Sequence, residues 1–176
     1  MMKKISVTLI ALSLAGGEVA LAADNPNSVT ISGTIQNTSC TVSTGTADQT
    51  VFLGDISSKQ FYQAGASSLP MQFTVDLQNC TGSMSGVTVT FNGQPDNTDP
   101  SLLALDGGDN AASGLGIAIL DVNRTLIPLN NPSSNYAIDI NDTDNQLVFY
   151  AQYRSTASTV NAGSATATAT FDLTYQ

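Results

Sequence analysis

The two cysteines of this sequence are the residues whose chemistry is easiest to assign. Cys40 and Cys80 are its only cysteines. An even number of cysteines favours a structural disulfide if the chain is exported, as its first 22 residues predict below. A redox pair or a metal site is the alternative, but the spacing is not Cys-x-x-Cys and the sequence contains no histidine. We therefore expect a Cys40–Cys80 bond, which would close a loop of about 40 residues and stabilise the fold by roughly 4 kcal/mol.

Other catalytic or metal-binding chemistry has little support. Without histidine, neither a Ser-His-Asp nor a Cys-His arrangement can be assembled. Residues 139–144 resemble the start of a calcium loop, but Asp144 stands where an EF-hand needs glycine and Tyr150 where it needs glutamate. We interpret this stretch as a solvated acidic turn. A glycosidase pair of aspartates stays open, because its spacing depends on the fold. We expect no enzyme, no cofactor and no metal.

The first 22 residues are typical of a secretory signal peptide. Lys3 and Lys4 precede an apolar stretch, and Ala20-Leu-Ala22 forms an Ala-x-Ala cleavage site. The apolar stretch, about ten residues long, is too short to cross a bilayer. A retained anchor is the alternative. We expect cleavage after Ala22, no membrane insertion, and one domain in the mature chain.

The charge of the chain excludes some classes of partner. Its formal net charge is −9 at pH 7. Beyond the expected cleavage site the basic residues are Lys59, Arg124 and Arg154. Three scattered cations cannot neutralise a row of phosphates, so we expect no binding to nucleic acid or to anionic membranes.

Alternating apolar residues between turn-rich loops predict an antiparallel β-sandwich rather than a parallel sheet with crossover helices. Residues 115–120 are apolar on both faces and should lie deep. Residues 57–66 should form a loop or a single turn. The predicted strands are 29–42, 51–56, 71–77, 87–91, 115–120, 125–129, 136–140, 147–153 and 164–176.

The last predicted strand has one apolar and one polar face over six repeats. Such a strand normally has a neighbour on each side, yet the sequence ends there. A segment of similar character, residues 29–35, precedes the first cysteine. The sequence therefore suggests a protein that lacks a strand at one end and carries a spare strand at the other.

These features together resemble the pilin subunits of chaperone–usher fimbriae, most closely the minor (adaptor) subunits of type 1 fimbriae. Gly163 and Tyr175 match the family's glycine fourteen residues from the end and its penultimate aromatic residue. Cys40-Thr-Val42 and Leu77-Gln-Asn-Cys80 match its cysteine settings, and Ile31-Ser-Gly33 matches its donor strand. Residues 112–117 and 127–134 look like the family's mid-chain segments.

The resemblance implies an immunoglobulin-like antiparallel sandwich that lacks its final strand. Residues 23–36 would be a donor-strand extension and residues 37–176 the pilin domain. A periplasmic pilus chaperone would fill the groove left by the missing strand, and the neighbouring subunit would replace it at the outer-membrane usher. The subunit would pass through the periplasm to the cell surface. The donor residues would be Val29, Ile31, Gly33 and Ile35, and the groove and chaperone-binding strand would comprise Gly163, Ala165, Ala167, Ala169, Phe171, Leu173 and Tyr175.

Several alternatives stay open at this point. A tip adhesin would need an additional receptor-binding domain, for which the chain has no room. A major pilin differs from a minor one in the mid-chain segments, which favour the minor subunit. A free secreted sandwich would have to fold residues 29–35 into its own groove. Gly33 could also mark an ordinary β-bulge.

Overall fold

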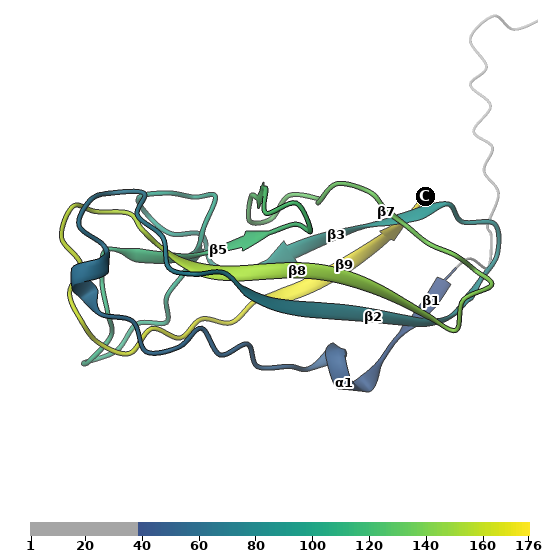
Figure 1. Cartoon of the computed structure of the whole chain (residues 1–176), viewed down its shortest axis with the longest axis horizontal. Helices are drawn as coiled ribbons and strands as arrows, with labels where there is room; N and C mark the ends of the chain where they lie inside the picture. The colour runs from purple at the N-terminus through teal and green to yellow at the C-terminus, as the bar shows by residue number, and fades with distance from the viewer. Residues whose placement is uncertain (1–38) are drawn as a thin grey trace, which may run out of the picture. The chain divides into compact units, whose positions relative to one another are not determined.

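Two antiparallel β-sheets lie face to face in this computed structural model, which describes residues 39–176 (Figure 1). The larger sheet has the strand order β1-β2-β8-β5-β4, with β6 paired to β5, and the smaller one has the order β7-β3-β9. The elements are β1 (Ser39–Val42), α1 (Thr44–Ala47), η1 (Ser58–Gln60), β2 (Met71–Thr81), β3 (Gly86–Asn92), β4 (Leu103–Ala104), β5 (Leu115–Leu120), β6 (Leu126–Ile127), β7 (Tyr136–Ala137), β8 (Asp144–Ser155) and β9 (Thr170–Tyr175).

The long strands of the larger sheet follow from their residue patterns. All six residues of β5 are buried, as expected for a run that is apolar on both faces. In β8 the side chains of Leu147, Phe149 and Ala151 are buried, while the residues between them are more exposed. β2 pairs with β8 from Met71↔Ala151 to Gln78↔Asp144. This pairing joins the two longest strands of the molecule.

In the smaller sheet, β3 lies between β7 and β9. It pairs with β9 from Val87↔Tyr175 to Asn92↔Thr170. Val87, Val89 and Phe91 of β3 are buried on the inner face. The side chains that β9 adds to this face are only half-buried. The inner face of the sheet is therefore well covered at β3 and less covered at β9.

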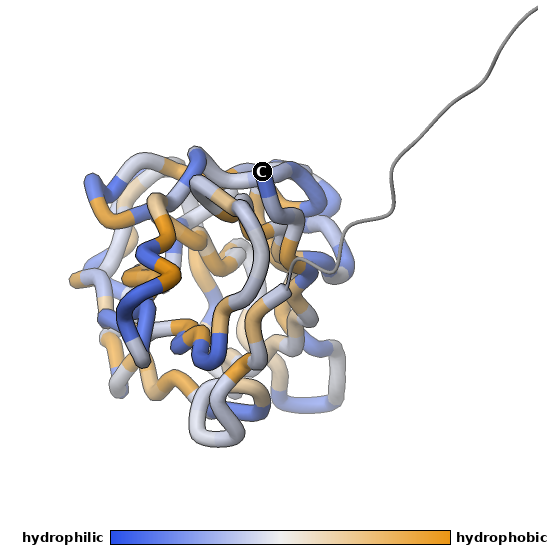
Figure 2. The backbone as a smooth tube through the Cα atoms, turned by 90° about the vertical axis from the view of Figure 1, so that its right-hand side faces the viewer, coloured by the Kyte–Doolittle hydropathy of each residue, from blue (hydrophilic) through white to orange (hydrophobic). Residues whose placement is uncertain are grey.

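Aromatic side chains from both sheets meet in the core. The ring of Phe91 lies edge-on to that of Phe149, with ring centres 5.0 Å apart, and Phe73 stacks on Phe149 at 5.6 Å. Tyr136 contacts Phe149 from β7, and its hydroxyl donates to the carbonyl of Val148 at 3.0 Å. Viewed from one end, hydrophobic and hydrophilic stretches are interspersed along the chain (Figure 2).

The structure confirms the all-β antiparallel sandwich and corrects several strand predictions. Residues 115–120 form a strand with the predicted bounds, and residues 57–66 contain a single 3₁₀ turn. The prediction of a strand at residues 51–56 was wrong, because no neighbouring strand supplies hydrogen bonds there in the described part of the chain. The last strand is shorter than predicted, since its ladder begins at Thr170. The predicted strands at 125–129 and 136–140 shrink to two residues each.

Three sequence predictions lie outside the described residues: the signal peptide at residues 1–22, the donor-strand extension at residues 23–36, and the part of the predicted strand 29–42 that precedes Ser39. Across residues 39–176, no helix combines the length and the hydrophobicity that a membrane crossing requires.

Candidate functional site: a groove beside the last strand

A long groove opens between two segments that are far apart in the sequence. Residues 47–58 form one wall and residues 160–171 the other, and the groove has a volume of about 1360 Å³. In Figure 1 these segments are the dark blue stretch between α1 and η1 and the yellow stretch leading into β9. Core side chains from both sheets reach its floor, among them Phe73, Val75, Phe91, Leu103, Ile117 and Ile119. The floor of the groove is therefore the apolar core itself.

The backbone of the second wall is paired on one edge. Gln176 exchanges hydrogen bonds with Ser85 and Gly86, and the carbonyl of Thr166 accepts from the amide of Asp106 at 2.7 Å. Successive residues of an extended strand direct their polar groups to opposite edges. The main-chain N–H and C=O groups of the even-numbered residues thus point toward β3 and the loop before β5. Those of the odd-numbered residues point toward the groove. Within residues 39–176, no strand pairs with this second edge of β9.

The side chains of this wall keep the predicted alternation. From residue 165 to residue 176 every odd-numbered residue is half-buried and every even-numbered one is exposed. The groove is lined by Ala165, Ala167, Ala169 and Phe171. Leu173 and Tyr175 continue the same face and pack against the core beyond it. The methyl groups of the three alanines leave the groove open along this wall, whereas larger side chains would fill it.

Gly163 lies at the start of this wall, where the chain passes close to another backbone. A Cβ atom at this position would lie 2.5 Å from the carbonyl oxygen of Asn110 and 2.6 Å from the amide nitrogen of Ala112. The amide of Ser164 donates to that same Asn110 oxygen at 2.7 Å, and the amide of Ala112 donates to Ser164 at 2.8 Å. Only glycine permits this approach, so Gly163 anchors the wall to the loop before β5.

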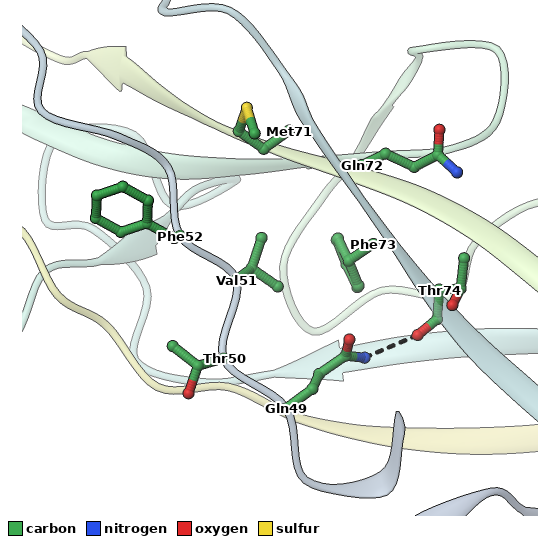
Figure 3. Close-up of a pocket in the computed structure, with 8 residues that line it drawn as sticks. All are labelled: Gln49, Thr50, Val51, Phe52, Met71, Gln72, Phe73 and Thr74. Carbon is green, nitrogen blue, oxygen red and sulfur yellow. Dashed lines mark hydrogen bonds between the residues drawn. The ribbon is translucent and has the colours of Figure 1, made fainter. Parts of the chain in front are cut away.

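The first wall is extended but is fixed by side chains instead of a ladder. The side-chain amide of Gln49 donates to the carbonyl of Thr74 at 2.8 Å (Figure 3), and the hydroxyl of Thr46 accepts from the main-chain amide of Asp76 at 3.0 Å. Leu53 is buried, whereas the neighbouring Phe52 is 71% exposed. A smaller hollow of about 410 Å³ separates residues 49–52 from residues 71–74 of β2. This wall therefore has room on both sides.

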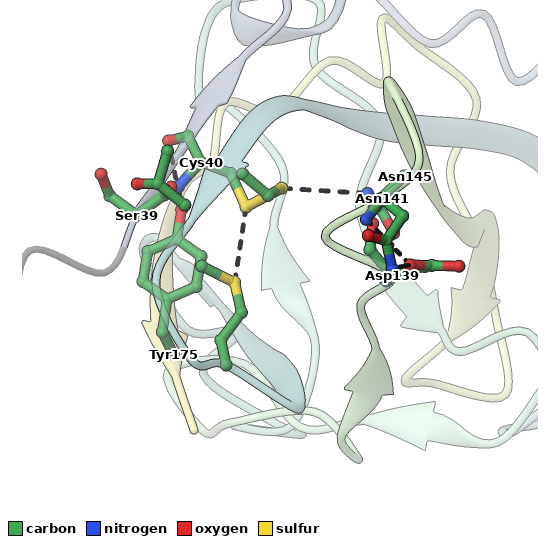
Figure 4. Close-up of a disulfide and its surroundings, with 9 residues drawn as sticks. Ser39, Cys40, Asp139, Asn141, Asn145 and Tyr175 are labelled. Carbon is green, nitrogen blue, oxygen red and sulfur yellow. Dashed lines mark hydrogen bonds between the residues drawn. A yellow bond between two sulfur atoms is a disulfide. The ribbon is translucent and has the colours of Figure 1, made fainter.

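The predicted disulfide is confirmed. It lies at the end of the sandwich where β1 meets the end of β2. Cys40 of β1 is bonded to Cys80 of β2 (Figure 4). The sulfur of Met84 lies 3.7 Å from Cys40 Sγ, and the side-chain amide of Asn145 donates to Cys80 Sγ at 3.8 Å. The bond is therefore packed among side chains of the fold and ties the start of β1 to the end of β2 within the larger sheet.

The acidic stretch at residues 139–144 forms a turn held by its own side chains. A carboxylate oxygen of Asp139 accepts from the main-chain and side-chain amides of Asn141 at 2.9 and 3.0 Å. Asn145 bonds to both main-chain polar groups of Asp139 (Figure 4). In the described region, no group of three or more His, Cys, Asp or Glu side chains is arranged to hold a metal ion.

Two parts of the site are not evident from the residue pattern. Residues 51–56 were predicted as a strand, and their role as the facing wall was not recognised. Tyr153 lies at the end of the predicted strand 147–153, where the pattern gives it no special role, but it lines the groove and its hydroxyl donates to the carbonyl of Ala165 at 2.8 Å. Burial, and to a smaller extent the charge of Asp55, raises the pKa of Tyr153. No local pattern could have identified this contact, because it joins β8 to the segment that leads into β9.

Comparisons with known proteins agree with this geometry. Residues 29–176 match the family described as fimbrial protein. The chain is 38% identical to the fimbrial-like protein YcbV of Escherichia coli strain K12, over 99% of both chains. It is 35% identical to the fimbrial subunit type 1 of Salmonella typhimurium, over the whole of both chains. A solved subunit of a chaperone–usher pilus is similar at 27% identity and a TM-score of 0.65, with 87% of this chain and 97% of that one covered.

Proposed function

The chain belongs to the fimbrial protein family, and we propose that this pilus subunit is joined to its neighbours by donor-strand exchange. Members of the family are structural subunits rather than enzymes, share the immunoglobulin-like fold of chaperone–usher pilins, and are assembled into fimbriae on the cell surface. The proposal concerns how this subunit is connected within such a fibre.

The observation that carries the proposal is the groove beside the open edge of β9. The groove offers an apolar floor, and the odd-numbered residues of its second wall direct their main-chain groups toward it. These are the two requirements for strand addition, in which a ladder of backbone hydrogen bonds supplies affinity and alternate side chains supply specificity. An open edge of this kind would also promote aggregation if it stayed uncovered.

The occupants are those that the resemblance to chaperone–usher pilins implies. A periplasmic pilus chaperone would cover the groove of the exported subunit first, and at the outer-membrane usher the donor segment of the next subunit would replace it. The donor segment of this chain is residues 29–35, with Val29, Ile31 and Ile35 as the inserted side chains and Gly33 at the closest approach. The groove residues are Gly163, Ala165, Ala167, Ala169 and Phe171, with Leu173 and Tyr175 continuing the chaperone-binding strand.

A deletion separates donor from acceptor. Removing residues 24–36 should leave the groove and the disulfide intact, so the subunit should still be recovered bound to its chaperone. It should fail to fill the groove of the preceding subunit, which a mixing assay on a non-boiled gel detects. As matched point variants, Ile31→Asp should block exchange and Ser32→Asp, on the other face of the segment, should not. Detergent-resistant pairs formed by the deletion variant would show that residues 29–35 are not the donor strand.

Within the fibre, the proposed role is that of a minor (adaptor) subunit. The sequence basis is the resemblance of residues 112–117 and 127–134 to the mid-chain segments of minor subunits. A minor subunit should be present in few copies per fibre, whereas a major subunit forms its whole length. Immunogold labelling of a tagged subunit distinguishes the two, and continuous labelling along the shaft would identify a major pilin instead.

A further inference from the structure

Tyr153 occupies a main-chain acceptor that a strand in the groove would otherwise use. The carbonyl of Ala165 belongs to the odd-numbered residues whose main-chain groups face the groove, because Ser164 and Thr166 on either side of it bond to the loop before β5. The hydroxyl of Tyr153 already donates to this carbonyl at 2.8 Å. This groove-facing carbonyl thus already accepts one hydrogen bond from within the subunit itself.

The position of Tyr153 is held from two directions. Its main-chain amide donates to the hydroxyl of Ser68 at 3.1 Å, and its carbonyl accepts from the amide of Ser68 at 3.0 Å. Ser68 itself is buried. The side chain of Tyr153 packs with the small apolar cluster around Phe61 and Leu115. The phenol therefore reaches across from β8 to the far wall as a fixed part of the fold.

From this geometry we infer that Tyr153 sets the register limit of the incoming strand. The inference rests on the proposed strand exchange and adds to it a residue that determines where the ladder stops. A strand entering the groove can bond to the odd-numbered residues from Ala167 onward, but its next amide meets a carbonyl that already has a donor. In a donor segment shifted by two residues toward Gly163, that amide would have to share the carbonyl with the Tyr153 hydroxyl, and a weakened or lost bond is costly in an apolar groove.

This register limit divides the wall into two parts that have different hydrogen-bond partners. From Ala167 onward, the groove-facing edge is available for a partner. Before Ala167, the wall bonds within the subunit, through Tyr153 to Ala165 and through Asn110 and Ala112 to Ser164. Tyr153 thus acts on register, not on whether a strand binds.

The test uses the full chain with a copy of residues 28–38 appended after a short linker, so that the segment can return along β9. NMR measures hydrogen-bond scalar couplings and hydrogen exchange for the amides of this segment. In the unaltered sequence we expect couplings to the carbonyls of Ala167 and Ala169 and none to Ala165. In Tyr153→Phe a coupling to Ala165 should appear, and exchange of that amide should slow at least tenfold. Tyr150→Phe, on the outer face of the same strand, is the control and should change neither.

The outcomes are distinguishable. A coupling to Ala165 in the unaltered sequence, or no gain in Tyr153→Phe, would overturn the register limit while strand addition stands. Absence of protection along the whole appended segment would overturn the proposed strand addition and the register limit with it. The measurement on the unaltered sequence does not depend on how well the variant folds.

Discussion

The hydroxyl of Tyr175 is bonded to both main-chain polar groups of Cys40, although the two residues are 135 positions apart. It accepts from the amide at 3.1 Å and donates to the carbonyl at 3.3 Å (Figure 4). Tyr175 belongs to β9 and Cys40 to β1, so this pair of bonds joins the smaller sheet to the disulfide-bonded edge of the larger one. The penultimate residue and the disulfide thus form one structural unit.

Tyr175→Phe should therefore lower the free energy of unfolding by about 1–2 kcal/mol, since two hydrogen bonds are lost and the ring is kept. Denaturant titration of the full chain measures the change. Tyr62→Phe is a suitable control, because Tyr62 is 75% exposed and should tolerate the loss of its hydroxyl. Equal stability of the two variants would show that the Tyr175 contact does not contribute.

Gly163→Ala should destabilise the wall of the groove, because the added methyl would collide with the backbone of residues 110–112. Overpacking against main chain typically costs about 1–3 kcal/mol. Gly107→Ala provides the matched control, since a Cβ atom there meets nothing within 4 Å. Thermal unfolding of both variants gives the comparison. A Gly163→Ala protein as stable as the control would mean that the loop before β5 yields at no cost.

Phe171→Asp should abolish chaperone binding and lead to degradation in the periplasm. Phe171 lines the groove and contacts the ring of Phe91, with centres 6.4 Å apart, so a carboxylate there would lie unpaired against the core. Thr170→Asp introduces the same charge one residue earlier, on the exposed face. Periplasmic yield and co-purification with the chaperone report the difference. Normal capture of the Phe171 variant would contradict the groove assignment.

Alkaline pH should weaken the fold through Tyr136. Burial raises the pKa of Tyr136 from its ordinary value of 10.0 to about 12. A backbone hydrogen bond from Val122 opposes this rise in pKa, and the charge of Asp121 adds to it. Between these values the unfolded chain releases the phenolic proton and the folded chain keeps it, so stability falls as pH rises from about 10 to 12. Tyr136→Phe should reduce this slope in denaturant titrations at several pH values. An unchanged slope would assign the loss to other groups.

The sequence predicted the fold best where one pattern determines burial. Leu115–Leu120 could be read correctly because a run that is apolar on both faces fits only a covered strand. Residues 51–56 show the limit: Leu53 is buried and Phe52 exposed as alternation predicts, but a strand also needs a hydrogen-bonding neighbour, which a local pattern cannot reveal.

The groove was predictable in outline and not in detail. The small side chains of Ala165, Ala167 and Ala169 indicated a wall that leaves space, and the structure places all three along the groove. The facing wall and the contact of Tyr175 with Cys40 involve residues distant in the sequence, and the bond from Tyr153 to Ala165 joins β8 to the segment before β9. Such contacts depend on which strands become neighbours, and that is decided by the packing of the whole sandwich.

The pairing of β3 with β9 has a consequence for the time course of folding. β3 cannot complete its sheet until β9 reaches it, and β2 likewise waits for β8. Domains built from such distant pairings fold slowly, in roughly milliseconds to seconds. Throughout that interval the apolar faces of β2 and β3 are exposed, which is when chains of this kind aggregate. The period of greatest risk for this chain therefore precedes the existence of the groove, and protection has to begin before there is a finished site to bind.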